Sequence, residues 1–214
     1  MGKNGILAII ALLALIAGVI GLLFTEYQGG PKINLRPYQA LGAVTAEETA
    51  KLLGNRGSIA VIAEDFGQYN MAWVKVQMSA FQSTLKKNGI ALTKIEKVID
   101  PQLSEGQGQT FTAEVLLRLI QNNPQVSGVV IFASLPDFSG QDLAQLKQHG
   151  KRIVVVSKTS VGYRTLFESG AIHLAIVARA EAPVPSEKKR RTPRELFNDE
   201  YIVVTGANLS DLPP

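Results

Sequence analysis

The chain of 214 residues contains no cysteine. This absence excludes disulfide bonds, thiol nucleophiles and cysteine-ligated metal sites. Histidine is nearly absent too, since only His149 and His173 are present. They fall in different expected elements without the spacing of metal ligands, so we expect neither a metal site nor a histidine-based catalytic set.

The signature motifs of common α/β enzymes are also missing. The sequence has no GxGxxG dinucleotide fingerprint, no GxxxxGK[ST] phosphate loop and no GxSxG nucleophile elbow. An acidic pair, Glu64 and Asp65, is similar to the pair that binds magnesium in phosphoacceptor receiver domains. Such domains need an aspartate at the end of the third strand, where this chain has Ala133 and Ser134. We therefore expect a protein that is not an enzyme, with no catalytic residues and no cofactor.

One long apolar run is present, "GILAIIALLALIAGVIGLLF", and it carries no charged residue. Twenty helical residues span about 30 Å, the thickness of the hydrocarbon core of a bilayer. The run predicts one transmembrane helix over residues 5–24, after a tail of residues 1–4. A cleaved signal peptide is the alternative, but no A-x-A-like site precedes the polar "TEYQGG". We favour an uncleaved anchor in the cytoplasmic (inner) membrane, with the body of the protein outside the cytoplasm.

Small side chains share one face of this predicted helix. Small residues spaced by four let transmembrane helices approach closely, although alanine and glycine are common in such helices in any case. The pattern indicates a surface for membrane helix association that consists of Ala14, Ala17, Gly18 and Gly21.

The formal net charge is +4, and much of it comes from "EKKRRTPRE", residues 187–195. A basic run can bind anionic lipid or nucleic acid, but it is more often a solvated loop. No aromatic residue interleaves this run, so a nucleic-acid partner is not expected.

Residues 25–57 read as a stalk or linker. Gly29, Gly30, Pro31 and Pro37 interrupt the segment, so no long element is expected there. The pair Thr45 and Glu48 has the spacing of a capping box, which predicts a short helix that ends at Gly54.

From residue 58 to residue 206, short apolar runs alternate with amphipathic segments. This order predicts an α/β domain: a mainly parallel sheet of about six strands with helices on both faces. The second run, "IALTKIEKVID", alternates in polarity, which is typical of a strand near the edge of a sheet. Residues 207–214 are expected to form an irregular tail. The expected strands cover residues 58–63, 90–100, 128–134, 152–157, 171–180 and 200–206.

In sheets of this kind, ligands bind beyond the carboxyl ends of the strands. The residues that follow the expected strands are polar or aromatic, and they make up the candidate ligand-binding set. The set is Asp65, Phe66, Asp100, Ser134, Asp137, Phe138 and Ser157.

The segment "GSIAVIAEDFGQYNMAWVKVQMSAFQSTLKKNGIAL" resembles the opening of type I periplasmic binding proteins, the sugar-binding family related to lac repressor-type regulators. "VIDPQLSEGQGQTFTAEVLLRLIQNNPQVSGVVIFASLPD", "DLAQLKQHGKRIVVVS", "ESGAIHLAIVARA" and "EYIVVTGANL" continue the likeness in the same order. The resemblance implies that loop residues such as Phe66, Asp100, Ser134 and Asp137 face a ligand cleft.

Proteins of that family have two lobes that close around a ligand, and this chain is too short for the second lobe. A single lobe offers a shallow surface instead of a cleft that buries most of a ligand. The missing wall would come from a second copy of the chain or from another protein. We therefore expect a single-pass membrane protein whose domain is an interaction or scaffolding subunit of a membrane complex. The alternative is a membrane-anchored binding module for a small polar ligand such as a sugar.

Overall fold

The computed structural model describes residues 33–66, 71–99, 109–180 and 191–213. The chain divides into two compact units, Met1–Asn34 and Leu35–Pro214. The predicted tail, the predicted transmembrane helix and its residues Ala14, Ala17, Gly18 and Gly21 all lie outside the described residues. Of the helices within the described ranges, none has the length and apolar character needed to cross a membrane.

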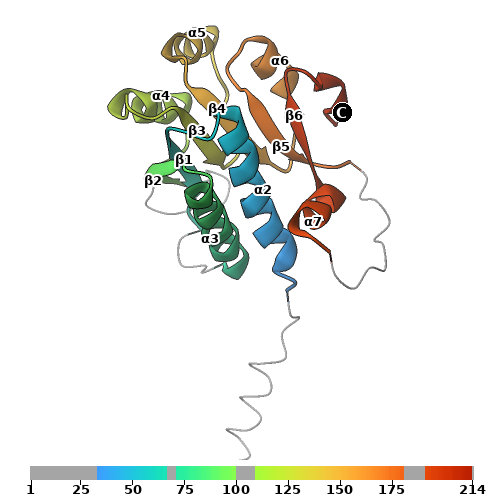
Figure 1. Ribbon diagram of the computed structural model, residues 1–214. Helices are drawn as coiled ribbons and strands as arrows, with labels where there is room; N and C mark the ends of the chain where they lie inside the picture. The colour runs from blue at the N-terminus through green and yellow to red at the C-terminus, as the bar shows by residue number, and fades with distance from the viewer. Residues whose placement is uncertain (1–32, 67–70, 100–108, 181–190, 214) are drawn as a thin grey trace, which may run out of the picture. The chain divides into compact units, whose positions relative to one another are not determined.

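The second unit is built on a six-stranded sheet with the strand order β2-β1-β3-β4-β5-β6 (Figure 1). The first five strands pair in parallel, and β6 pairs antiparallel with β5. The predicted mainly parallel α/β sheet is therefore confirmed. The strands are β1 (Ser58–Glu64), β2 (Ala91–Val98), β3 (Gly128–Phe132), β4 (Arg152–Ser157), β5 (Leu174–Ala178) and β6 (Tyr201–Thr205).

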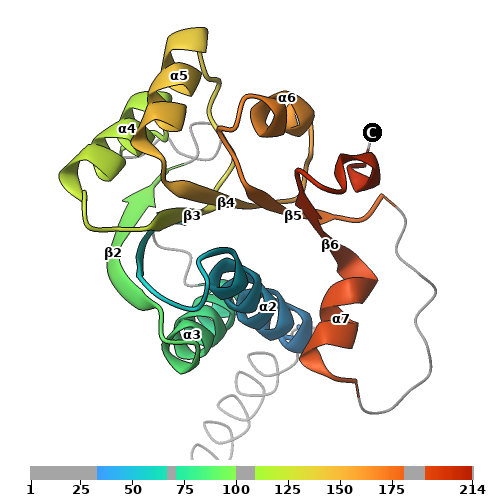
Figure 2. The same ribbon diagram turned by 45° about the horizontal axis from the view of Figure 1, so that its top comes forward.

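Helices cover both faces of the sheet, as Figure 2 shows. One face carries α2 (Arg36–Leu52), α3 (Ala72–Lys87) and α7 (Pro193–Glu200), and the other carries α4 (Ala113–Asn122), α5 (Gly140–His149) and α6 (Tyr163–Glu168). A short 3-10 turn, η1 (Leu209–Asp211), lies in the segment predicted to be an irregular tail.

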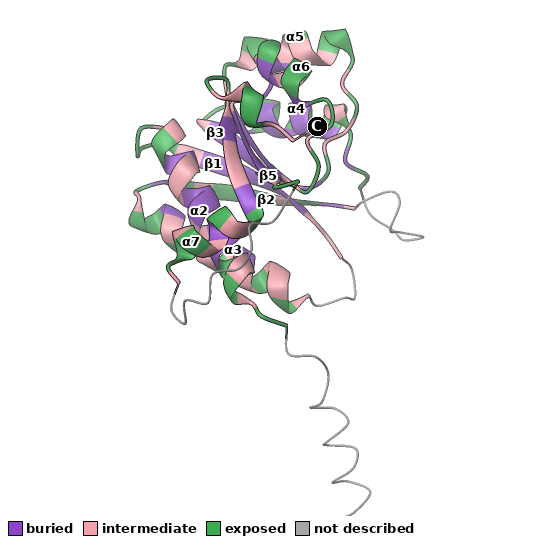
Figure 3. Cartoon of the chain, turned by 90° about the vertical axis from the view of Figure 1, so that its right-hand side faces the viewer, coloured by how far each residue is buried: buried purple, intermediate pink, exposed green. Residues whose placement is uncertain are grey.

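Successive side chains of a strand point to opposite faces of the sheet. Because helices cover both faces, the central strands are buried on both sides. Ile59 and Val61 of β1 belong to the core under α2 and α3, whereas Ala60 and Ile62 belong to the core under α4 to α6. In Figure 3 the buried residues, in purple, make up much of the strands and parts of the helices that cover them. β2 lies at the edge and is largely exposed, as its alternating sequence predicts.

Where the structure describes it, the predicted stalk of residues 25–57 is wrong. Residues 36–52 form α2, a helix of 17 residues that is packed into the domain. Pro37 lies in the first turn, where its missing N–H costs no helical hydrogen bond. Thr45 does not start a helix: it is buried within α2, and its hydroxyl donates to the carbonyl oxygen of Leu41 at 2.7 Å.

Small side chains let α2 lie directly against its neighbours. A Cβ atom at Gly42 would come within 2.0 Å of the carbonyl oxygen of Gln77 on α3. The two helices therefore touch backbone to backbone at this point. The buried positions of α2 are Ala40, Leu41, Gly42, Val44, Thr45, Ala46, Thr49 and Ala50.

Other helices begin and end at capping motifs. Ser139 and Asp142 form a capping box at the start of α5, and Thr192 and Glu195 form one at the start of α7. Gly150 ends α5 in the left-handed conformation that glycine adopts at little cost.

The contact at Gly42 yields a stability test. We expect Gly42→Ala to lower the free energy of unfolding by about 2 kcal/mol, because overpacking a tight contact typically costs 1–3 kcal/mol. Denaturant unfolding followed by the fluorescence of Trp73, the single tryptophan, measures the change.

Gly140→Ala is the matched control, since a Cβ there meets no atom within 4 Å. It should be neutral or stabilise by up to about 1 kcal/mol through helix propensity. If both variants unfold like the wild type, α2 does not pack on α3 through Gly42.

Candidate functional site

Strand register brings the predicted site loops to one edge of the sheet. Ala63 of β1 pairs with Phe132 of β3, and Ile131 pairs with Val155 of β4. The parallel strands β1, β3 and β4 therefore end side by side. We call the segments that follow them the carboxyl edge: residues 64–66, 133–139 and 157–161.

Six of the seven predicted ligand-binding residues lie at this carboxyl edge. Ser134 and Asp137 are exposed, although they follow a strand that is almost entirely buried. The seventh, Asp100, falls outside the described residues. The other four are Asp65, Phe66, Phe138 and Ser157, and all are partly exposed.

An aromatic trio, Tyr38, Phe66 and Trp73, lies where β1 leads into α3. The Phe66 ring meets the Trp73 ring edge-on at 5.4 Å between centroids, and Trp73 packs against Tyr38 at 5.4 Å. Offset and edge-on pairs of this kind are favourable. Sequence reasoning found only Phe66, because Tyr38 and Trp73 come from two helices whose pairing is a tertiary feature.

Asp65 is tied to the neighbouring strand at the same point. Its backbone N–H donates to the carbonyl oxygen of Val98 at 2.7 Å, and its Oδ2 lies 3.5 Å from Lys97 Nζ. The loop thus leaves β1 in a defined direction, with the Phe66 ring held against Trp73.

The loop between β3 and α5 is held at its far end by the capping box. Ser139 N donates to Asp142 Oδ2 at 2.8 Å, and Asp142 N donates to Ser139 Oγ at 3.2 Å. The hydrogen bonds from the Ser139 hydroxyl and then from its backbone N–H lower the pKa of the Asp142 carboxyl. Phe138 packs against the core, so the exposed side chain of Asp137 projects from an anchored segment.

The loop between β4 and α6 is organised by its own hydroxyl groups. Ser157 Oγ accepts from Thr159 N at 3.2 Å, and Thr159 Oγ1 accepts from Val161 N at 3.3 Å. Beneath the loop, the buried hydroxyl of Tyr163 has no hydrogen-bond partner among the described residues. Burial raises the pKa of this phenol, and the neighbouring Ser157 hydroxyl lowers it in part.

The carboxyl edge thus offers the hydroxyls of Ser134 and Ser157, the exposed carboxylate of Asp137 and the aromatic ring of Phe66. Such groups can accept and donate hydrogen bonds to a polar molecule and pack against its apolar parts. Within the described ranges, no group of three histidine or acidic residues is arranged to hold a metal ion.

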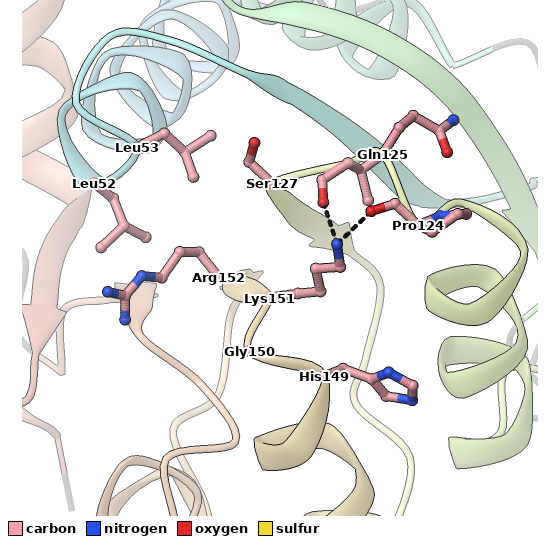
Figure 4. A pocket seen from close by; sticks show the side chains of 10 residues that line it. Leu52, Leu53, Pro124, Gln125, Ser127, His149, Gly150, Lys151 and Arg152 are labelled. Carbon is pink, nitrogen blue, oxygen red and sulfur yellow. Dashed lines mark hydrogen bonds between the residues drawn. The ribbon is translucent and has the colours of Figure 1, made fainter.

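A pocket of about 520 Å³ lies at the other end of the strands (Figure 4). We call this end the amino edge. The sequence pattern did not indicate this pocket. The candidate residues follow the strands, whereas the pocket is formed by segments that precede strands. It is lined by Leu52, Leu53, Pro124, Gln125, Val126, Ser127, His149, Gly150, Lys151 and Arg152.

Comparisons by sequence find no relative: no protein-family description matches the chain, and no curated protein does. Comparison by structure does find similar proteins. One is an ABC transporter solute-binding protein from Burkholderia graminis in complex with D-arabinose, with a TM-score of 0.56 and 15% identity over 83% of this chain and 62% of that chain. A second is GanP, a glucose-galactose binding protein from Geobacillus stearothermophilus, with a TM-score of 0.52 and 16% identity over 81% of this chain and 61% of that chain.

A third similar structure is the XylFII-LytSN complex, with a TM-score of 0.53 and 14% identity over 80% of this chain and 61% of that one. Two of these structures are named for binding a solute or a sugar. This chain spans about three fifths of their length. At such low identity the likeness concerns the fold alone, and the predicted periplasmic-binding-protein-like α/β fold is confirmed.

Proposed function

We propose that the domain of residues 35–213 is a binding module for a small polar ligand such as a sugar. The observation that carries this proposal is the meeting of polar and aromatic side chains at the carboxyl edge. In parallel α/β sheets, ligands bind beyond the carboxyl ends of the strands. The similarity to structures of a D-arabinose complex and a glucose-galactose binding protein supports this alternative over a purely scaffolding role.

Each group at the edge has a role in this proposal. The Phe66 ring, held by Trp73, packs against the apolar face of the ligand. Asp137 accepts hydrogen bonds from ligand hydroxyls, because an ionised carboxylate is an acceptor only. The hydroxyls of Ser134 and Ser157 both donate and accept, and Asp65 adds a second carboxylate.

We propose that the carboxyl edge supplies one wall of the site. A ligand on one wall stays more exposed than the 70–90% burial that is usual for pockets. We propose that a second copy of the chain or a protein partner closes the site from the other side.

A role as an interaction subunit of a membrane complex is the second candidate, and one observation favours it. Val161 of the carboxyl edge is an apolar side chain that is 81% exposed, and in this second candidate function it contacts the partner protein. In this reading the predicted helix of residues 5–24 anchors the protein, and the domain lies outside the cytoplasm.

A ligand panel tests the binding module. We expect at least one sugar, amino acid or nucleoside to raise the unfolding temperature of the full-length protein, because a ligand that binds only the folded state stabilises it. Phe66→Ala and Asp137→Ala should abolish the shift, as measured by thermal unfolding. Glu168→Ala removes an exposed carboxylate at the end of α6, and in this control variant the ligand should still raise the unfolding temperature. A panel without any stabilising compound would count against the proposal.

Extraction in a mild detergent tests the interaction subunit. We expect the tagged full-length protein to migrate with partners at fixed stoichiometry, identified by sizing and mass spectrometry. Bulky residues at Gly18 and Gly21 should disrupt the assembly if the predicted membrane helix contributes to it. A monomer that travels alone would contradict this reading.

A further inference from the structure

The pocket at the amino edge is assembled from three separate turns. The end of α2 contributes Leu52 and Leu53, the loop before β3 contributes residues 124–127, and the loop before β4 contributes residues 149–152. Its volume of about 520 Å³ falls within the 300–1,000 Å³ of typical small-molecule sites. The chain therefore carries a second concave surface, remote from the carboxyl edge.

Lys151 fixes one wall of this pocket. Its Nζ donates to the carbonyl oxygens of Pro124 and Val126, each at 2.7 Å, as the dashed lines in Figure 4 mark. The ammonium group thus joins the loop before β3 to the loop before β4. These two bonds are charge-assisted, so they hold the wall more firmly than neutral hydrogen bonds would.

Arg152 is left without such a partner. Its side chain is exposed, and its guanidinium makes no ion pair or hydrogen bond to any residue in the described ranges. Figure 4 shows it beside Leu52, across the pocket from the loop that carries Gln125 and Ser127. A guanidinium offers several donors in a planar fork that matches a phosphate or a carboxylate.

The charge around the pocket has one sign. Among the described residues, Lys151 and Arg152 line it and no carboxylate does. Basic residues in the last turn of a helix can simply complement its dipole, and Lys147 and His149 at the end of α5 fit that account. The helix dipole does not account for Arg152, because Arg152 is the first residue of strand β4.

We infer that the amino-edge pocket is a second binding site, for a small molecule that carries a phosphate or carboxylate group and an apolar part. Arg152 binds the oxyanion, Gln125 and Ser127 offer hydrogen bonds, and Leu52 and Leu53 contact the apolar part. Lys151 is a positioning residue that shapes the wall. This inference does not depend on the function proposed for the carboxyl edge.

Calorimetric titration of the full-length protein in a non-ionic detergent at low ionic strength tests it. Pyrophosphate and citrate are the probes, one for the phosphate group and one for the carboxylate group. We expect saturable binding of at least one probe at one site per chain, and the stronger probe identifies the preferred group. Arg152→Gln should weaken that binding by at least about tenfold, the loss expected for a charge-assisted hydrogen bond.

Two variants control the result. Lys147→Gln removes an equal charge from the same edge without touching the pocket lining, and it should change the affinity by less than about twofold, since an exposed charge that makes no direct contact interacts weakly through water. Glu114→Gln at the exposed start of α4 should change nothing. Each variant is compared with the wild type for thermal unfolding without a probe.

Two results would overturn the inference. One is the absence of saturable binding by both probes. The other is an equal loss of affinity in Arg152→Gln and Lys147→Gln, which would mean that anions respond to the diffuse positive field of the edge and not to a site.

Discussion

A parallel sheet needs apolar cover on both faces, and this requirement governs the whole domain. Three crossover helices, α4, α5 and α6, cover one face, but α3 is the only helix from a parallel crossover on the other. The gap between α3 and α7 is filled by α2, which comes from before the first strand. Because its side chains are small, α2 packs closely against Val61, Val154 and Ile176 of the sheet. At Gly42 it contacts the backbone of α3.

The same helix links the two ends of the strands. At its start, Tyr38 packs against Trp73 and so supports Phe66 at the carboxyl edge. At its end, Leu52 and Leu53 form the apolar wall of the amino-edge pocket. Arg194 of α7 binds Glu47 and Glu48 in the middle of α2, at 2.8 and 2.6 Å, which ties the helix to the last strand pair. Each candidate site therefore contains a contribution from a helix outside the crossover units.

The sheet could be predicted from the sequence because its strands are continuous apolar runs such as "AVIA" and "VVV", which alternate with amphipathic segments. The helix α2 could not, because alanine, threonine and glycine fill all of its buried positions except Leu41 and Val44 and give no clear apolar periodicity, and because Pro37 indicates a break. Asp65, Phe66, Ser134 and Ser157 could be placed at one edge from the strand ends alone. Trp73, Tyr38 and the amino-edge pocket could not, since they depend on which helices and loops meet in space.

Helix direction separates the chemistry of the two edges. The helices of the crossover units run opposite to the strands, so their first turns lie at the carboxyl edge and their last turns at the amino edge. Acidic side chains favour first turns and basic ones last turns, because each complements the helix dipole. Glu114 and Asp142 begin α4 and α5, whereas Lys86, Lys87, Lys147 and His149 end α3 and α5. The last turns of α3 and α5 thereby bring basic side chains to the amino edge, where we infer an anionic ligand, whereas the ligand proposed for the carboxyl edge is a neutral polar molecule.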